Sequence, residues 1–521
     1  MKHNRSISVP ISRLLPELLS LVFCHVRDAI AGKSGHDHSF ERPFEFKRRF
    51  AVKNWMKISH VCHSWREVAL NTVSLWSHLI VTRSNYKWAE ECLRRSKESS
   101  LVLFAKFSGA NGLNSHHPSR ALLRELKNHI ERCRVLNLQL ATEDLIDLLS
   151  QTNTSHLVQF HYCHLSDSAG SRHLPPLIDD SLLRADSLLR LSVFSCPVDW
   201  TASIFHRLTH LKLYYIPEES KLGYHAFVSF LICMPRLEVL DLCDFLQMEN
   251  SEGNHRKADG THLQHLKFVK LDDNPHALAG FLSSLPIPSL CIVVINTDEY
   301  TTAEDILPIL SWVSNHFRPP ISESPSISDA NQNYWRSLRI FYLEPFISFQ
   351  GYTIKENLDE NESLFKHTVW PPDVSFDDPD LPQSLITLLP ISRIDHLEIC
   401  SDFHRSVLSM WMWIDIFGSV PTLESICIKA NSLPFFQALQ YYDRGPLSFP
   451  ALSSVVVRGD RNADYDVILR SLRLRFRLGV AIKRLVLDGC PIVPSSDLMR
   501  LQKLVGHVEV INCQVRIETI Q

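Results

Sequence analysis

The chain has 521 residues, more than one ordinary domain, which favours several domains or one extended repeat. Hydrophobic residues make up 45% and charged residues 21%, a balance typical of a folded protein with ample core. The formal net charge of -3 gives no general attraction to nucleic acid or to an anionic membrane. Bulk charge therefore indicates no partner, and we expect neither nucleic acid nor a membrane to be one.

The cysteine pattern and the apolar runs bear on the compartment. The 13 cysteines are spread singly, with no CxxC pair, which suits a reducing compartment and predicts no disulfide framework. The N-terminal stretch has no continuous apolar segment of signal-peptide length, and the most apolar internal run, LCIVVI at 290–295, is too short to span a bilayer. We therefore expect a cytoplasmic or nuclear protein.

The first predicted element is a short apolar helix in LLPELLSLVF, residues 14–23. Pro16 suits the first turn of a helix, and apolar residues then recur at helical spacing. After an interruption at about 27–53, the segment from Trp55 to Val81 carries a second apolar helical stripe. So small a unit can bury only part of these two faces, so the remaining apolar surface predicts an interface.

The rest of the chain carries a repeat of the form apolar-x-x-apolar-x-apolar. Clear copies begin at Leu208, Leu237, Leu263, Leu290, Leu423, Leu452 and Ile482, and looser copies at Cys133, Leu157, Leu188, Leu338, Ile394 and Val505. The last four positions of each copy predict a short strand, and helical stretches such as 224–236 and 464–479 lie between copies. One such unit cannot bury its own apolar face, but stacked copies can, which predicts a curved α/β solenoid. An ordinary mixed α/β domain is the alternative.

This repeat resembles the leucine-rich repeat family in an irregular form. The Asn or Cys that usually follows the strand is present only in places, as at Cys196, Cys243 and Cys490. We expect the solenoid over 131–521, with 82–130 as a linking strand and helix segment and solenoid cap. Two intervals near 318–333 and 356–384 are rich in Pro, Ser, Asp and Glu, which predicts loop insertions; binding loops are the alternative.

The N-terminal segment resembles the F-box. LLPELLSLVF, ISHVCHSWREVAL and SLWSHL match its helices over roughly residues 12–81, with an internal insertion at about 27–53. The likeness is greatest to the F-box-like proteins of mushroom-forming fungi, and F-boxes are commonly paired with C-terminal leucine-rich repeats. The two resemblances imply an α/β fold in which a small N-terminal helical F-box-like module precedes an irregular leucine-rich-repeat-like α/β solenoid.

The F-box resemblance also implies a partner, the Skp-type adaptor of an SCF-type cullin-RING ubiquitin ligase. The positions matching the adaptor-binding helices are Leu14, Leu15, Pro16, Leu18, Leu19, Phe23, Ile58, Val61, Cys62 and Trp65. Packing inside the module is the alternative role for each of them. The chain would then be a non-catalytic substrate receptor for ubiquitin-dependent protein degradation. The alternative is a leucine-rich-repeat protein-binding scaffold that engages no ligase.

The repeats would hold the target protein. In each strand the residues flanking the inward pair would line the concave face of the solenoid. They are His210, Lys212, Tyr214, Asp241, His265, Lys267, Lys429, Arg458, Arg484 and Asp488. Their mixture of both charges suits a protein surface without naming a target, and a solvated strand position is the alternative for each.

The sequence lacks the common catalytic motifs. It contains no GxSxG, HExxH, GxxxxGK[ST] or GxGxxG, so we expect no enzyme, cofactor or metal. The nearest cluster of metal-ligating residue types, HYCHLSDSAGSRH at 161–173, has a spacing unlike any standard zinc module. The arginine-rich run RSLRLRFRLG at 470–479 predicts the solvated face of a repeat helix rather than a phosphate site.

Overall fold

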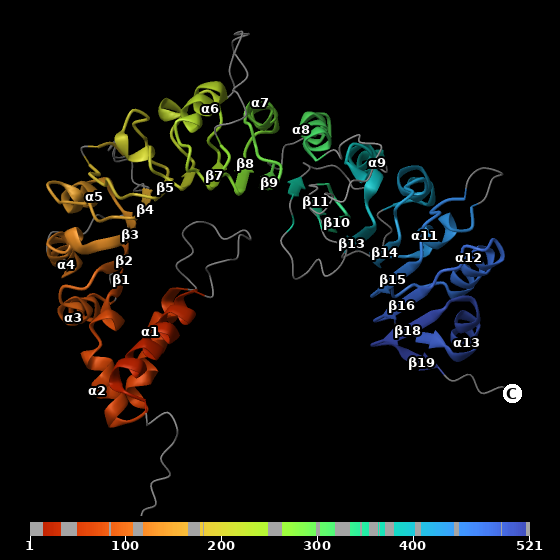
Figure 1. The fold of residues 1–521 in the computed structure, drawn as a ribbon, viewed down its shortest axis with the longest axis horizontal. Coiled ribbons are helices and arrows are strands. Elements are labelled where there is room, and N and C mark those ends of the chain that lie inside the picture. The colour runs from red at the N-terminus through yellow and green to blue at the C-terminus, as the bar shows by residue number, and fades with distance from the viewer. Residues whose placement is uncertain are drawn as a thin grey trace, which may run out of the picture. The chain divides into compact units, whose positions relative to one another are not determined.

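The computed structural model describes residues 14–32, 49–82, 85–107, 118–164, 178–180, 182–247, 263–297, 303–317, 334–343, 346–353, 363, 365–369, 380–401, 408–441, 447–490 and 492–516. The chain forms two compact units, Met1–Lys221 and Leu222–Gln521. Both are mixed α/β, with mainly parallel strands whose helices lie along one face (Figure 1). The expected insertion near 318–333 lies outside the described residues. In the part of the chain described, no helix has both the length and the apolar composition needed to cross a bilayer.

The first unit opens with a helical module. Its elements are α1 (Pro16–Gly32), the 3₁₀ segment η2 (Arg49–His60), α2 (His63–Asn71) and the 3₁₀ turn η3 (Val73–Trp76). One side of α1 buries Leu19 and Phe23, and the Phe23 ring lies 5.1 Å from that of Trp65 on α2. These contacts give the module a small core of its own.

Trp76 anchors this module on the first repeat of the same unit. Its indole N–H donates a hydrogen bond of 2.9 Å to the Ala69 carbonyl, and its ring packs edge-on against Trp55 at 5.3 Å. On its other side the ring meets Trp88 at 5.5 Å and carries the Arg95 guanidinium 4.5 Å from its centre. Aromatic and cation–π contacts of this kind add to the stability gained from buried area alone.

Parallel strands form the sheet of the first unit. They are β1 (His78–Thr82), β2 (Leu101–Lys106), β3 (Cys133–Leu140), β4 (Gln159–His164), β5 (Arg190–Phe194) and β6 (His210–Tyr214). Each strand pairs in parallel with the next. Its helical segments are α3 (Tyr86–Ser96), α4 (Pro118–Lys127), η4 (Ile130–Arg132), α5 (Thr142–Leu149), η5 (Ser203–Phe205) and η6 (Glu218–Ser220). The stretch 82–130, expected to link and cap, therefore already contains a full strand of this sheet.

The second unit continues the strand-and-helix alternation. Its parallel strands are β7 (Val239–Cys243), β8 (Phe268–Asp272), β9 (Ile292–Asn296), β13 (His396–Ser401), β14 (Ser425–Lys429), β15 (Ser454–Arg458), β16 (Arg484–Asp488) and β18 (His507–Ile511). A separate pair, β17 (Ile492–Pro494) and β19 (Gln514–Arg516), is also parallel.

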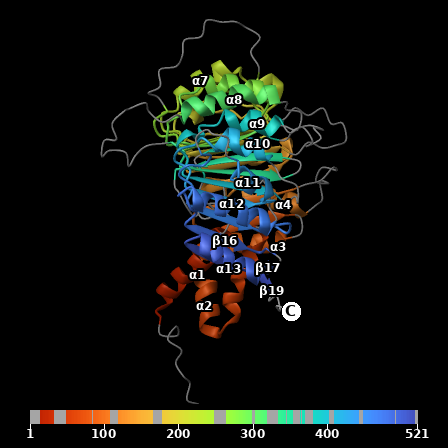
Figure 2. The same ribbon diagram turned by 90° about the vertical axis from the view of Figure 1, so that its right-hand side faces the viewer.

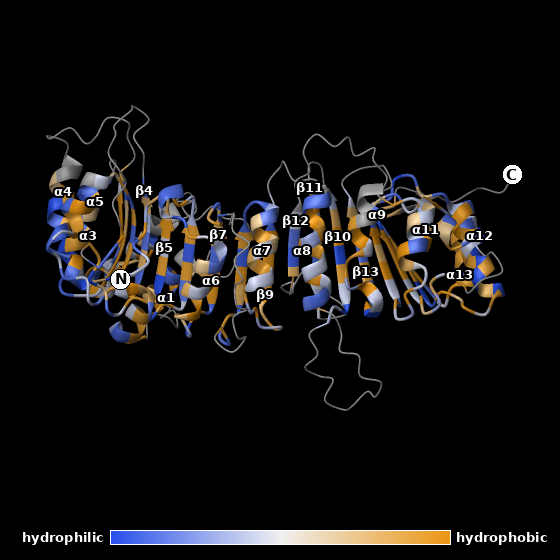
Figure 3. Cartoon of the chain, turned by 90° about the horizontal axis from the view of Figure 1, so that it is seen from above, coloured by the Kyte–Doolittle hydropathy of each residue, from blue (hydrophilic) through white to orange (hydrophobic). Residues whose placement is uncertain are grey.

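Helices cover one side of this second sheet. They are α6 (Tyr224–Ile232), α7 (Pro275–Ser284), α8 (Ala303–His316), α9 (Asp380–Thr387), the 3₁₀ turn η8 (Ile391–Arg393), α10 (Met410–Met412) with the π-helical η9 (Trp413–Phe417), α11 (Leu433–Ala438), α12 (Tyr465–Arg477) and α13 (Ser495–Leu504). Figure 2 shows α11, α12 and α13 stacked one after another. Figure 3 shows hydrophilic and hydrophobic bands on α8 and α12, as expected for helices that cover a sheet and face solvent.

Side-chain alternation explains why these segments are strands. In β2 the residues Leu101, Leu103 and Ala105 are fully buried, while the residues between them are half-buried. This period of two places one face against the helices and leaves the other, which we call the bare face, free of helices (Figure 1). The clear copies starting at 208, 237, 290, 423, 452 and 482 all begin their strands two residues later, as the pattern predicted.

The copy starting at Leu263 is the exception. We predicted a strand over the end of LQHLKF, but β8 begins at Phe268, three residues beyond the predicted start. LQHLKFVKL contains two overlapping matches, and the structure uses the second, which buries Leu266, Val269 and Leu271. A shift by an odd number of residues exchanges the two faces, so the side chains predicted here for the bare face were assigned wrongly.

An antiparallel meander interrupts the parallel order of the second unit. It consists of β10 (Ser337–Leu343), β11 (Phe346–Tyr352) and β12 (Phe365–Val369). Its outer strands rejoin the sheet in parallel, β12 beside β9 and β10 beside β13. The interval 356–384 is thus not a loop throughout, because it contains β12 and the start of α9. The acidic residues on either side of this short strand dominate the composition of the interval, which is why we predicted a loop.

An aromatic cluster holds this meander against the helices. The rings of Phe317, Trp335 and Phe365 lie 5.4 to 5.7 Å from one another, and all three are buried. Gly351 on β11 leaves the space that the Trp335 indole fills, since a Cβ at this position would lie 2.1 Å from an indole carbon. The meander therefore depends on a residue without a side chain at position 351.

We predict that Gly351→Ala lowers the free energy of unfolding by about 3 kcal/mol, because the buried indole must move to admit the methyl group. Urea unfolding of the full chain measures the change. Thr353→Ala, at an exposed position two residues away, is the control and should change little. Equal stability of the two variants would contradict the packing of Trp335 on Gly351.

A recurrent turn carries the ladder past the end of several strands. Ser195, Asp244, Gly459 and Gly489 directly follow strands, and each has a positive φ between 46° and 69°. Their N–H groups donate to the last carbonyl of the neighbouring strand at 2.8 to 2.9 Å. The left-handed conformation thus keeps one more ladder hydrogen bond and turns the chain toward the helix layer.

Buried carboxylates connect neighbouring loops beyond these turns. Asp273 accepts hydrogen bonds of 2.7 and 2.8 Å from the N–H groups of Phe245 and Leu246, and Asp460 accepts from the N–H and hydroxyl of Ser432. Burial raises the pKa of Asp273 to about 6, although the backbone donors act in the opposite direction. The sequence pattern pointed to Asn or Cys after the strand and did not identify these aspartates, which accept the hydrogen bonds that join the loops.

The raised pKa of Asp273 predicts a pH effect on stability. The fold prefers the protonated form, so the stabilisation by protonation is fully present below pH 3.8 and is lost as the pH rises through 6. We predict that the wild type loses about 3 kcal/mol relative to Asp273→Asn between about pH 4 and pH 7. Urea unfolding across this range, with the exposed Asp466→Asn as control, measures it; parallel pH profiles for wild type and Asp273→Asn would contradict it.

The arginine run at 470–479 is not solvated throughout, contrary to our prediction. Arg475 on α12 is fully buried and donates to the carbonyls of Ser448 and Phe449 at 3.0 and 2.9 Å. Burial lowers the pKa of Arg475 to about 10. Its neighbours Arg473 and Arg477 are exposed, as predicted. Arg475 thus ties α12 to the preceding repeat.

Candidate partner-binding surfaces

The outer side of α1 is a row of exposed apolar side chains. Leu15, Leu18, Val22 and Val26 follow at helical spacing and are 63%, 48%, 38% and 38% exposed. Leu14 and Leu21 flank this row, which we call the α1 apolar row, and are exposed as well. Large apolar residues gathered on one helix face are uncommon on a surface that has no partner.

The structure divides the residues predicted to bind an adaptor. Pro16 and Leu18 are exposed on α1, Leu14 and Leu15 are exposed just before it, and Val61 and Cys62 are exposed just before α2. The remaining four face inward: Leu19, Phe23 and Ile58 are buried, and Trp65 is half-buried against Phe23. These four form the core of the module, because they lie on the sides of α1, η2 and α2 that face one another. Leu21, Val22 and Val26 were missed, although they continue the helical spacing by further turns.

Polar contacts fix the C-terminal half of α1. The buried Arg27 guanidinium donates to the Ser74 carbonyl in η3 and forms an ion pair of 2.7 Å with Asp28. Arg27 also lies near His78 at the start of β1; burial, followed by this positive charge, lowers the pKa of His78 to about 4. The apolar row therefore projects from a helix that is held on its other side.

The bare face of the first unit carries part of the predicted target-binding set. His210, Lys212 and Tyr214 alternate with the buried Leu211 and Leu213 along β6, as predicted. His210 and Lys212 are half-buried, whereas Tyr214 is only 4% exposed and packs against Phe194 on β5. Tyr214 is thus mainly a packing residue, and the exposed Tyr215 beside it was missed.

On the second unit the predicted set again divides. Asp241 on β7 lies on the bare face but is only 4% exposed. His265 and Lys267 lie in the turn before β8 rather than on a strand, and Lys267 forms an ion pair of 2.8 Å with Glu238. The residue on the bare face beside Asp241 is Lys270, which the shifted strand places there. Lys429, Arg458, Arg484 and Asp488 lie on strands as predicted.

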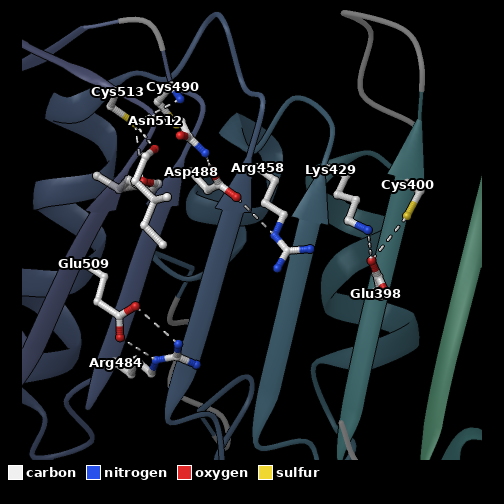
Figure 4. A network of polar contacts seen from close by, with 12 residues as sticks. Glu398, Cys400, Lys429, Arg458, Arg484, Asp488, Cys490, Glu509, Asn512 and Cys513 are labelled. Atoms are coloured by element: carbon white, nitrogen blue, oxygen red, sulfur yellow. Dashed lines mark hydrogen bonds and ion pairs between the residues drawn. The ribbon is translucent and has the colours of Figure 1, made fainter. Parts of the chain in front are cut away.

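A buried charge cluster lies on the bare face of the second unit. Glu398 on β13 accepts from Arg339 on β10 at 2.6 Å. It also forms an ion pair of 2.5 Å with Lys429 on β14 (Figure 4). The Arg339 and Glu398 side chains are only 7% and 5% exposed. Burial alone would raise the pKa of Glu398, but the Lys429 hydrogen bond and the charges of Arg339 and Lys429 together lower it below its ordinary value.

Further along the same face, the charges are paired but open to solvent. Arg458 lies 3.6 Å from Asp488, and Arg484 contacts Glu509 at 3.2 Å. Figure 4 shows these side chains on neighbouring strands. The pKa of Glu509 lies below its ordinary value, mainly because Arg484 donates hydrogen bonds to this carboxylate. Exposed pairs of this kind contribute little to stability, so they remain available to a partner.

The stretch 161–173, whose spacing was unlike a zinc module, is described only as far as His164. On β4, His161 precedes and Cys163 follows Tyr162, and His164 contacts the Tyr162 hydroxyl. His173 lies outside the described residues. No group of three or more His, Cys, Asp or Glu side chains suited to a metal ion occurs in the described ranges.

Comparison with known proteins adds little to this description. No protein-family model matches the sequence, and no curated protein matches it. One solved structure with a match is the crystal structure of the Rad7 and Elc1 complex in yeast. The two chains share 12% sequence identity, and the match covers 91% of this chain and 88% of that chain with a TM-score of 0.27. A TM-score this low does not establish a common fold.

The Glu398 cluster yields a stability prediction. Glu398→Ala leaves the Arg339 guanidinium buried without its carboxylate, so we expect the free energy of unfolding to fall by about 3 to 5 kcal/mol. The double variant Arg339→Met, Glu398→Leu should recover most of this loss. Urea unfolding at neutral pH measures both, with the exposed Glu424→Ala as control. A loss of unfolding free energy for Glu398→Ala no larger than for the control would contradict the stabilising role of the Glu398 cluster.

Proposed function

We propose that this chain is a non-catalytic substrate receptor of an SCF-type, cullin-RING ubiquitin ligase, working in the cytoplasm or nucleus. In this proposal the helical module binds a Skp-type adaptor, and the bare faces of the repeats hold a target protein. The receptor performs no chemistry; it raises the effective concentration of the target near the ligase. The resemblance of the N-terminal sequence to the F-box, closest to the F-box-like proteins of mushroom-forming fungi, supports a Skp-type adaptor as the partner.

The α1 apolar row is the observation that carries the proposal. Recognition of a helix in an apolar groove uses a few large side chains at i, i+3, i+4 and i+7, and Leu15, Leu18 and Val22 offer that spacing. Val61, which lies just before α2 and is 61% exposed, adds to the module's apolar surface. The opposite side of α1 is packed into the module, so binding would require no unfolding of the helix.

The bare faces suit a protein target better than a small molecule. Their half-exposed side chains include both charges, as in the Arg458 and Asp488 pair, together with apolar residues such as Val294 and Phe341. Mixed charge over an extended sheet favours specificity among proteins more than affinity for one charged group.

A second candidate is a repeat scaffold that engages no ligase. The anchoring of the module on its own first repeat through Trp76 and Arg95 favours it, because these contacts give the module a structural role. The two candidates differ in one property, direct binding of the adaptor.

We predict that Leu15→Asp, Leu18→Asp weakens binding of a purified Skp-type adaptor by about a hundredfold or more, because each change places a charge at an apolar anchor that the adaptor would bury. Isothermal titration calorimetry of the full chain with the adaptor measures the affinity. Both positions are exposed, so the variant should unfold at the same urea concentration as the wild type.

The matched control is Leu290→Asp, an equally drastic change at a leucine that is 70% exposed in the second unit. It should leave adaptor binding unchanged. Wild-type affinity in the α1 variant would show that the row is not the docking surface. Absence of adaptor binding by the wild-type chain would leave the repeat scaffold as the remaining candidate function.

A further inference from the structure

The two cysteines that follow β16 and β18 lie against each other. These strands pair in parallel up to Asp488 and Ile511. Two residues beyond each strand come Cys490 and Cys513, and the N–H of Cys490 donates to the Cys513 sulfur at 3.1 Å. Figure 4 shows both residues at the same end of the ladder. Sequence spacing gave no sign of this pair, because the two positions are separated by a whole repeat.

Paired backbone on both sides holds the two cysteines together. Before them, the Gly489 N–H donates to the Ile511 carbonyl at 2.9 Å, while Gly489 and Asn512 have φ values of 69° and 52°. After them, β17 pairs in parallel with β19. Neighbouring parallel strands lie about 4.8 Å apart, within the roughly 4.4 to 6.8 Å between Cα atoms that a disulfide needs.

The two thiols differ in access to solvent. Cys490 is fully buried, whereas Cys513 is half-buried. Burial raises the pKa of Cys490 to about 12, and the nearby Cys513 contributes to the shift. An oxidant therefore reaches Cys513 first, and Cys490 is placed to attack from within the fold. In the present structure both cysteines are free thiols.

We propose that Cys490 and Cys513 form a reversible disulfide on exposure to a small-molecule disulfide such as oxidised glutathione, and that this bond locks the repeat built from β17, α13 and β18. The Cys513 thiolate attacks one sulfur of glutathione disulfide, whose S–S bond breaks to release one glutathione. Cys490 then attacks the Cys513 sulfur and its proton passes to the departing glutathione thiolate, so the second glutathione leaves as a thiol. Two thiols are oxidised, and one glutathione disulfide is reduced to two thiols.

The expected consequence is a more rigid repeat. The bond closes the chain segment from 490 to 513, which contains α13, and so restricts the locally unfolded state of this repeat more than its folded state. Protease cleavage within this segment proceeds through local opening, so its rate should fall by about tenfold or more on oxidation.

Peptide mapping of the full native chain by mass spectrometry, after incubation with glutathione disulfide, tests the proposal. We expect a cross-linked peptide joining Cys490 and Cys513, lighter by two hydrogens and reversed by dithiothreitol. The exposed Cys62 and Cys233, both free thiols, should instead carry glutathione adducts, since no hydrogen bond in the described part of the chain joins either of them to another cysteine. A native chain in which Cys513 remains a thiol or keeps its glutathione adduct would overturn the bond.

Two variants separate the bond from general oxidation. Cys490→Ala should accumulate glutathione on Cys513 and lose the protection from protease, whereas Cys233→Ser should form the bond as the wild type does. Circular dichroism and the urea midpoint of the reduced Cys490→Ala chain check that it is folded. A cross-link that leaves the cleavage rate of the 490–513 segment unchanged would overturn the locking role.

Discussion

The parallel hydrogen-bonded ladder is the constraint on which the rest of each unit depends. A single strand and helix expose an apolar face that only a neighbouring repeat can cover. The ladder fixes the register of each repeat, and a slip by one residue would turn its leucines toward solvent. Residues such as Ser195 and Gly459, with positive φ, extend the ladder past the strand end, and the buried Asp273 and Asp460 then join consecutive loops. Register thus determines which side chains reach the bare face.

The sequence predicted strands wherever one unambiguous copy of the repeat was present. It misplaced β8 because LQHLKFVKL fits the repeat twice, and only three-dimensional burial distinguishes the two. It missed β11 and β12 because their antiparallel pairing lies outside the repeat, and Gly351 reads as a break although it makes room for Trp335. A hydropathy scale also cannot show that Arg475 is buried, because the carbonyl groups that accept its hydrogen bonds belong to a loop distant in the sequence.

The candidate adaptor surface was predictable in kind but not in detail. Helix α1 is apolar over much of its circumference, so spacing alone could not tell which side the module covers. The structure places Leu19 and Phe23 inside and Leu15 and Leu18 outside, and the outer row continues to Val26. Because the inner side already stabilises the helix, substitutions on the outer row can test binding without removing the fold. That separation of roles is what makes the function testable.

The charge pairs on the bare face of the second unit limit how a target could be held there. Glu398 is already neutralised by Arg339 and Lys429, and a partner that displaced either cation would leave a buried charge uncompensated. The exposed pairs, such as Arg458 with Asp488, lose hydration on binding and regain little, so they select among partners more than they add affinity. Affinity on this face must therefore come from half-exposed apolar residues between the charges, such as Val456 and Phe341. A target that fits would bring apolar side chains to these positions and oppositely arranged charges around them.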